Sequence, residues 1–322
     1  MHLVSPALST GPLSSSATSD GGRAPARPTR GPRRRRVRFQ PAWLFVAPSL
    51  VIFAVFVFYP IASAIVYSFF DWQIGATSQR WLGLGNYSHL LHDSQFWNSL
   101  RVTLVFTVVS VVVLLVLGFV TALMLLRNTL ANRVVRSVLL FPTIVSFVTI
   151  GMVWKFLLDP SIGLVGGLTR AIGLGPVAWL QDVNLALPTV IFVAIWRSTG
   201  FTVVLFVAGL QNVPPELYEA ARLDGANQRQ LVRHITLPSI RPTMLFATTI
   251  LTIQSLQVFD LVFVMTGGGP LFRTDSLVNL LYRYGFVNFQ TGYASAISQV
   301  LLLIIIVVSL VQLRIFRFND VD

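Results

Sequence analysis

The chain has 322 residues, of which 54% are hydrophobic and only 11% are charged. With a mean hydropathy of +0.71, a water-soluble domain would lack an adequate polar surface, so the bilayer must be the solvent. The absence of cysteine excludes disulfides, thiol nucleophiles and cysteine zinc sites. The single lysine, Lys155, lies in an apolar segment and belongs to no Gly-x-x-x-x-Gly-Lys-Ser/Thr loop, so ATP hydrolysis by that route is excluded.

Residues 1–38 differ from the rest of the chain. They are rich in Ser, Pro, Gly and Arg and end in a basic run from Arg33 to Arg38, which predicts a disordered tail. The tail holds eight arginines against Asp20, or +7 of the formal charge of +12. We interpret it as a cytoplasmic topology anchor beside anionic headgroups rather than a nucleic-acid-binding arm.

Six apolar runs follow, each long enough to cross about 30 Å of hydrocarbon at about 1.5 Å per residue. Because a backbone in lipid must satisfy its own hydrogen bonds, these runs are predicted to be helices, kinked or ended by Pro48, Pro60, Pro142 and Pro188. A signal-peptidase site at Ala62-Ser63-Ala64 is the alternative for the first run, which we expect to be retained because it is long and continues to Phe70. The predicted spans are about 42–70, 100–126, 135–158, 185–210, 243–265 and 294–316.

Arginine and lysine counts predict the orientation. With the N-terminus inside, 17 basic residues fall on the cytoplasmic side and six on the other side. The positive-inside rule therefore places both termini, and the polar loop at 211–242, in the cytoplasm. The expected domains are the tail 1–38 and a six-helix domain at 39–322.

The polar loop predicts a bent pair of short helices. Pro214-Pro215-Glu216 is a favourable helix opening, and Gly225 is a natural stop that can adopt positive φ. A second amphipathic segment then runs up to Pro238, which we expect to end it. The pair should project from the membrane.

The same loop carries a spaced motif. It reads Glu219-Ala220-Ala221, three residues that include Asp224, then Gly225, nine residues, Ile235, one residue and Leu237-Pro238. This spacing resembles the signature of permease subunits of binding-protein-dependent ABC importers. The resemblance implies an all-α type I importer permease fold with six transmembrane helices in the bacterial cytoplasmic membrane, and a loop that couples to an ATPase. It also implies a second homologous permease, two ATPase subunits that bind ATP and Mg²⁺, and an extracytoplasmic substrate-binding protein, with no cofactor in this chain.

Four further segments resemble the carbohydrate and glycerol-phosphate branch of that family, and the first of its two permease subunits in particular. The resemblance covers roughly residues 40–318. By local chemistry alone the glycines and prolines in these segments are turn residues at the membrane surface. The segments are Gly83-Leu84-Gly85-Asn86-Tyr87, Asp159-Pro160 with Gly163, Thr266-Gly267-Gly268-Gly269-Pro270 with Thr274, and Gly292-Tyr293-Ala294-Ser295-Ala296.

Polar residues inside the spans are candidates for the solute pathway. Arg197 lies near the middle of the fourth run, where a charge costs about 3 kcal/mol on insertion scales, and Trp196 offers a flat face to a sugar ring. Gln254, Gln257 and Asp260 recur every three residues, close to one helical face. The alternative is structural: Arg197 pairs with Asp260 or a partner subunit, and the glutamines bond across helices. Arg197 slightly favours an anionic solute.

No constellation in the sequence indicates catalysis. His89, His92 and Asp93 have helical metal-ligand spacing, but their segment, with Trp81, Tyr87 and Trp97, is typical of an interfacial element, so we expect neither a metal nor a catalytic site. The sequence therefore predicts a non-catalytic permease subunit that moves a sugar, oligosaccharide or glycerol-phosphate-type solute by alternating access. The alternatives are a secondary transporter or channel, for which Asp260 is the sole acidic candidate, and a membrane scaffold or sensor.

Overall fold

The computed structural model describes residues 42–73, 75–76, 79–173 and 175–317, so the tail predicted at 1–38 lies outside the described residues. The regular secondary structure of the described residues is helical, apart from a two-residue antiparallel pairing of β1 (Phe70–Asp71) with β2 (Arg80–Trp81). The helices, with π-helices marked η, are α1 Ala42–Phe53, η1 Ala54–Phe58, α2 Tyr59–Tyr67, α3 Gly85–His92, α4 Ser94–Met124, α5 Leu130–Ile144, α6 Phe147–Leu157, α7 Leu164–Ala171, α8 Ala186–Gln211, α9 Pro215–Leu223, α10 Gln228–Leu231, η2 Val232–Thr236, α11 Leu237–Ser239, α12 Arg241–Leu256, α13 Asp260–Met265, α14 Leu277–Tyr282, η3 Arg283–Val287 and α15 Thr291–Arg317.

Five of the predicted spans are confirmed as helices long and apolar enough to cross a membrane. The third, predicted over 135–158 with a kink or an end at Pro142, consists of two helices, α5 and α6, bent by 97° at the break, and the pair counts as a sixth span if it crosses as one. Pro142 explains why α5 ends here, because it lacks the N–H that would bond one turn back and its ring crowds the preceding turn. Val145 and Ser146 then adopt extended backbone, and α6 starts in a new direction.

Two other prolines act on the turn that precedes them, whereas Pro48 lies inside α1 and Pro188 in the first turn of α8, so neither of these ends a helix. The π-helices η1 and η2 end immediately before Tyr59-Pro60 and Leu237-Pro238. A proline ring crowds the carbonyl four residues before it, and a wider π turn relieves that crowding without breaking the helix. Pro60 and Pro238 therefore widen their helices, which continue as α2 and α11.

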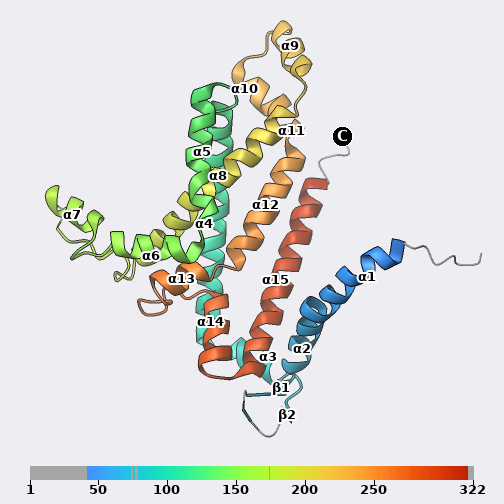
Figure 1. Ribbon diagram of the computed structural model, residues 1–322, viewed down its shortest axis with the longest axis vertical. Coiled ribbons are helices and arrows are strands. Elements are labelled where there is room, and N and C mark those ends of the chain that lie inside the picture. The colour runs from blue at the N-terminus through green and yellow to red at the C-terminus, as the bar shows by residue number, and fades with distance from the viewer. Residues whose placement is uncertain (1–41, 74, 77–78, 174, 318–322) are drawn as a thin grey trace, which may run out of the picture. The chain divides into compact units, whose positions relative to one another are not determined.

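Helices α4, α8, α12 and α15 run side by side and form the centre of the described bundle (Figure 1). Small residues bring them close: an ideal Cβ on Gly118 of α4 would lie 2.5 Å from the Thr202 methyl of α8. A Cβ on Gly209 would lie 2.5 Å from the hydroxyl oxygen of Thr243 on α12. Such close approach is how helices associate in a solvent as apolar as their own side chains.

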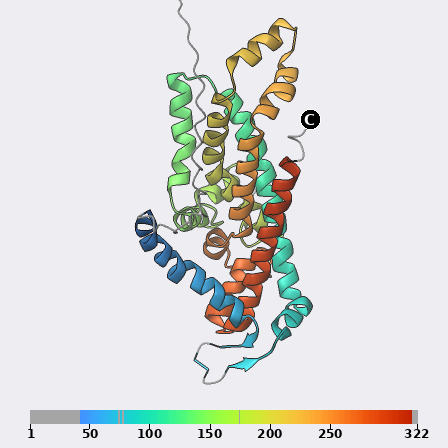
Figure 2. The same ribbon diagram turned by 90° about the vertical axis from the view of Figure 1, so that its right-hand side faces the viewer.

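The two ends of this bundle carry different structures. The α9–α11 segment extends at one end, and the β1–β2 pairing, α3 and α14 lie at the other (Figures 1 and 2). At the α14 end, fully buried Asp275 accepts hydrogen bonds from Arg283 (2.9 Å), from Asn279 (2.6 Å) and from Ser99 of α4 (3.2 Å). This network ties the loop after α13 to α4.

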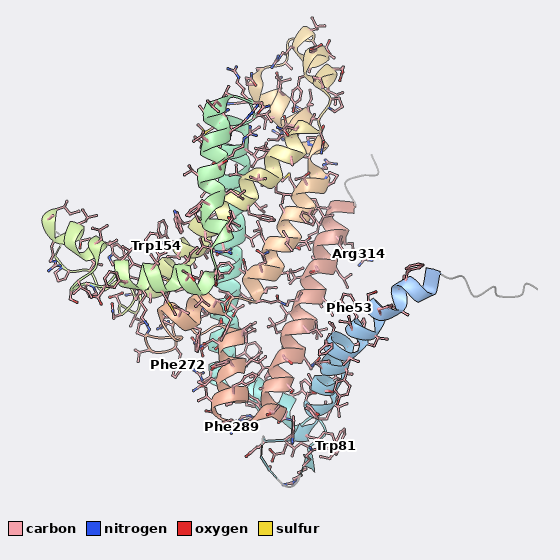
Figure 3. All side chains as sticks on the ribbon, viewed as in Figure 1. Phe53, Trp81, Trp154, Phe272, Phe289 and Arg314 are labelled. Atoms are coloured by element: carbon pink, nitrogen blue, oxygen red, sulfur yellow. The ribbon has the colours of Figure 1, made fainter. Side chains whose placement is uncertain are left out.

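That loop follows the turn chemistry expected from its glycines. Gly267 and Gly268 have φ of 61° and 91°, and the Thr274 hydroxyl donates to the Gly269 carbonyl at 2.6 Å. A Cβ on Gly268 would lie 2.9 Å from the Asn279 amide nitrogen, so the Asp275 network requires a glycine there. The centroid of the Phe272 ring in the same loop, labelled in Figure 3, lies 4.7 Å from the guanidinium carbon of Arg283.

Candidate functional site

The loop at 211–242 forms two short helices joined by a tight turn. Helix α9 opens on Pro215 and ends in a Schellman motif, in which the Ala226 amide donates to the Ala221 carbonyl at 2.9 Å and the Gly225 amide to the Arg222 carbonyl at 3.1 Å. Gly225 adopts φ of +83°, as expected. Helix α10 starts at once with a capping box between Asn227 and Gln230, with bonds of 3.0 and 2.8 Å.

The second half of the motif anchors this pair to the bundle. The Tyr218 hydroxyl of α9 lies 3.1 Å from that of Thr236, and Ile235 packs with Tyr218 and Met244 against buried residues of α8 and α12. Leu231 is 4% exposed in the same region. The prediction that Pro238 ends this segment is wrong. The helix continues through Leu237 and Pro238 as α11 and turns only at buried Ile240.

The first half of the motif is mostly exposed. Ala220 and Asp224 are exposed, Ala221 is half-buried, and a Cβ on Gly225 would meet no atom within 4 Å. Glu219 is also exposed, but it lines an open pocket with Tyr218 and with Leu123 of α4, on the side of α9 that faces the bundle. Leu223, one helical turn beyond Ala220, is 89% exposed. The sequence reasoning did not single out Leu223, although an apolar residue in a polar loop at helical spacing from Ala220 is a detectable signal of a docking face.

A second candidate region lies within the spans. A cavity of about 80 Å³, room for several water molecules, opens between α4, α6, α8, α12 and α13. Three of the predicted pathway residues, Gln254, Gln257 and Asp260, line it and are exposed. They do not share one continuous helix, because α12 ends at Leu256 and Asp260 opens α13. The helix break, rather than helical periodicity, turns Gln257 and Asp260 toward the same space.

Hydroxyl groups that the sequence reasoning missed also line the cavity. They are those of Ser110 on α4, Ser198 on α8 and Ser255 on α12. The Ser110 oxygen is buried and has no hydrogen-bond partner in the described part of the chain. Serines are ordinary in membrane helices, so only the assembled helices identify these three as a polar lining.

Arg197 lies at the corner between α5 and α6 and does not line the cavity. Its guanidinium donates to the Thr143 carbonyl at 3.0 Å and to the Val145 carbonyl at 3.2 and 3.3 Å. Its charged carbon lies 3.5 Å from the centre of the Phe147 ring, which does line the cavity. Between the described residues Arg197 and Asp260 there is no ion pair. Arg197 therefore satisfies the last carbonyls of α5 at the bend. Because it does not line the cavity, it gives no reason to expect an anionic solute.

Trp196 faces a different surface from the cavity. It lines an open apolar groove of about 580 Å³ with residues of α4 and α8. Its ring meets that of Trp154 on α6 edge to face, with centroids 5.5 Å apart, and Figure 3 labels Trp154 on that helix. The pair holds α6 against α8. The structure thus separates Trp196 and Arg197 from Gln254, Gln257 and Asp260.

The histidine segment has ordinary structural roles. Asp93 caps α4 through the Gln95 amide at 2.8 Å and accepts a hydrogen bond from the Tyr293 hydroxyl at 2.7 Å. The His89 ring packs 4.7 Å from that of Tyr293, and the His92 Nδ1 atom lies 2.8 Å from the Ser88 carbonyl oxygen.

Together, the long apolar helices, a polar cavity between them and an exposed helical pair at one end define a membrane transport subunit that works with another protein. Comparison with known proteins gives the family. Residues 114–319 match the binding-protein-dependent transport system inner membrane component, and the chain belongs to this family.

Named relatives cover most of the chain. The probable ABC transporter permease protein YurN of Bacillus subtilis is 35% identical over 85% of this chain and 95% of its own length. The trehalose/maltose permease protein MalF of Thermococcus litoralis is 32% identical over 86% and 94%. The sn-glycerol-3-phosphate permease protein UgpA of Agrobacterium fabrum is 33% identical over 84% and 93%. A chain of a solved bacterial ABC transporter that imports alginate superposes with a TM-score of 0.75, at 25% identity over 86% of this chain and 94% of that one.

These findings establish the class of the protein and the membrane in which it lies. It is a multi-pass inner-membrane protein with the type I importer permease fold, and the non-catalytic transport subunit of an ATP-driven importer. ATP is hydrolysed by a separate partner, and a substrate-binding protein is the other kind of partner such an importer uses. A secondary transporter, a channel and a scaffold are not favoured.

Proposed function

We propose that this chain forms one half of the translocation pathway for a sugar, oligosaccharide or glycerol-phosphate-type solute. A second, homologous permease forms the other half, two ATPase subunits bind on the cytoplasmic side, and a binding protein delivers solute from outside. The names of MalF and UgpA support the solute class. The excess of arginine on the Glu219 side supports a cytoplasmic location for both termini and the 211–242 loop.

The exposed side of α9 is the proposed docking face for an ATPase. Ala220 and Leu223 lie one helical turn apart and are exposed, and Glu219, also exposed, lies at the edge of this face beside the pocket between α9 and α4. Ala220 keeps the surface low enough for another backbone to approach, and Leu223 supplies an apolar anchor. Asp224 and Gly225 form the end of the helix, and the Ala221 carbonyl accepts the bond from the Ala226 amide that closes it. Ile235 packs with Tyr218 of α9, and Leu237 and Pro238 continue the chain from Ile235 toward α12.

This arrangement transmits force because the docking face and the bundle are rigidly joined. A push on α9 reaches Thr236 through the Tyr218 hydroxyl and reaches α12 through Ile235. Helix α12 in turn carries Gln254 and ends where the cavity residues Gln257 and Asp260 begin. We infer that ATPase closure tilts α12 and changes access to the cavity, which is alternating access.

Gln254, Gln257 and Asp260 are the proposed solute-pathway residues. Amide and carboxylate groups bond well to hydroxyl groups, and these three project into one cavity with free hydrogen-bonding capacity among the described residues. Arg197 and Trp196 contribute indirectly, by fixing the α5–α6 corner and the seat of α6. We expect Gln257→Ala to raise the KM for transport while the ATPase stays bound.

The outward-facing, low surface at Ala220 carries the proposal. Its test is Ala220→Trp, with Ala171→Trp in α7, at another exposed alanine, as the matched control. In proteoliposomes of the assembled importer, Ala220→Trp should abolish ATP-driven uptake and release the ATPase, while Ala171→Trp retains both. Full uptake by Ala220→Trp would refute the docking face.

A further inference from the structure

Two arginines from different elements lie where two membrane spans end. Arg233 belongs to η2, and Arg241 is the first residue of α12 and of the span that runs to Met265. Phe316 is the last residue of the span that starts at Thr291 in α15. All three line one pocket, so the pocket lies at the level of a membrane surface.

The pocket combines charge with an apolar wall. Its volume is about 220 Å³, and its lining is Arg233, Leu237, Pro238, Arg241, Met244 and Phe316. Arg233 is exposed and Arg241 half-buried, while Met244 and Phe316 are half-buried apolar groups on two different helices.

A hydrogen bond joins helices α12 and α15 next to this pocket, on the side toward the membrane interior. The Gln312 amide donates to the Thr252 hydroxyl at 2.9 Å, and the two helices pack along their length (Figure 1). Because Phe316 lies about one turn beyond Gln312, this bond holds the pocket's α15 wall against α12. The pocket is therefore built by fixed elements.

The chemistry of the lining points to a phosphate group. Guanidinium groups bind phosphate oxygens in a forked geometry, and two of them from different elements can hold one phosphate from two sides. At the end of a membrane span, the abundant phosphate belongs to lipid headgroups, and basic pockets between helices on the cytoplasmic side are typical of anionic-lipid sites. A soluble anion would gain nothing from Met244 and Phe316, whereas the first carbons of an acyl chain would.

We propose that this pocket binds the headgroup phosphate of an anionic phospholipid, with the lipid's chain against Met244 and Phe316. The bound lipid would sit between the start of α12 and the end of α15, directly beneath η2. It would therefore link the leaflet to the base of the 211–242 loop. The site needs only that the chain spans a membrane, so it stands or falls independently of ATPase docking.

The test is lipid binding to the full-length purified protein, measured by native mass spectrometry with phosphatidylglycerol and phosphatidylcholine as probes. Phosphatidylglycerol should bind more tightly. Arg233→Gln and Arg241→Gln should each weaken its binding about fivefold, and the double variant about 25-fold, as about 1 kcal/mol per arginine predicts. The matched control is Arg314→Gln on α15 (Figure 3), an exposed arginine outside the pocket lining, which should leave binding within about twofold of the unmodified chain.

Two further arms distinguish the source of the phosphate. Phe316→Ala should weaken binding of phosphatidylglycerol but not of inorganic phosphate, because it removes only the apolar wall. Excess inorganic phosphate should compete weakly. The proposal is overturned if the arginine variants bind phosphatidylglycerol normally, if Arg314→Gln weakens it equally, or if inorganic phosphate binds as tightly as the lipid. Unchanged thermal unfolding of each variant in neutral detergent shows that it is folded.

Discussion

The contact between α5 and α8 at Gly200 gives the sharpest stability prediction. An ideal Cβ on Gly200 would lie 1.9 Å from the Leu139 carbonyl oxygen and 2.7 Å from the Leu140 Cα atom. Carbon and carbonyl oxygen normally approach to about 3.3 Å. Gly200→Ala must therefore push the two helices apart, because both clashing atoms belong to backbone and cannot rotate away.

The expected magnitude follows from that displacement. Overpacking in a well-packed interior costs about 1–3 kcal/mol, and a clash with backbone places this variant near the upper value. A loss of about 3 kcal/mol corresponds to a melting temperature lower by roughly 4–5 °C for a chain of this size, because the unfolding entropy is about 2.1 cal/mol/K per residue. The separation should also loosen the Arg197 bonds at the α5–α6 corner, three residues from Gly200.

Thermal unfolding in one detergent, followed by tryptophan fluorescence, measures the effect. Gly167→Ala is the matched control, since Gly167 lies within α7, has no positive φ and has no atom within 4 Å of its ideal Cβ. That variant should be stabilised by about 0.5–1 kcal/mol, because alanine has the better helix propensity. If the melting temperature of Gly200→Ala equalled that of Gly167→Ala, the close packing of α5 on α8 would be wrong.

Three other substitutions test neighbouring parts of the structure. Arg197→Lys removes the forked contact at the α5–α6 corner and should lower the free energy of unfolding by about 1–2 kcal/mol, the value for hydrogen bonds between membrane helices. The transport KM should not change. A raised KM with a normal melting temperature would contradict the structural role of Arg197 at the corner. Asp275→Ala strands Arg283, which is 23% exposed, and should lower stability by about 3 kcal/mol, with partial recovery in Asp275→Ala/Arg283→Met; a single variant that melts normally would refute the network. The pKa of Asp159 is lowered by the Ser161 hydroxyl and by the Ile162 and Ser161 amides. Its stabilising effect is therefore present above the unfolded pKa near 3.8 and is lost as pH falls through the lower folded value. Hydrogen exchange of those amides should rise at that pH relative to Asp159→Asn, and equal profiles would exclude the effect.

The sequence predicts the parts of this fold that depend on composition or on one residue type. Apolar runs of sufficient length must be helices in lipid, and five are. A glycine after a short helix predicts the turn at Gly225, because few other residues adopt positive φ. The capping box at Asn227 and Gln230 follows from the same kind of local signal, a capping residue three positions before a glutamine.

Other features depend on packing between distant residues and could not be read from the chain. Pro142 permits either a kink or an end, and the carbonyls freed at the 97° bend are satisfied by Arg197, more than 50 residues away. Trp196 and Arg197 are adjacent in sequence, yet neither lines the cavity, because only packing decides which face of α8 meets α6. The Ser99–Asp275 bond joins residues 176 positions apart.

The central claim is that the exposed side of α9 docks on the ATP-hydrolysing partner. Since the chain has no cysteine, a single cysteine at Leu223, 89% exposed, can carry a photo-reactive maleimide. In membranes that contain the assembled importer, this probe should cross-link the permease to the ATPase, and the same probe at Ala171 should not. Cross-linking to the ATPase from Ala171 but not from Leu223, or labelling of the Leu223 cysteine from outside the cell, would contradict the account.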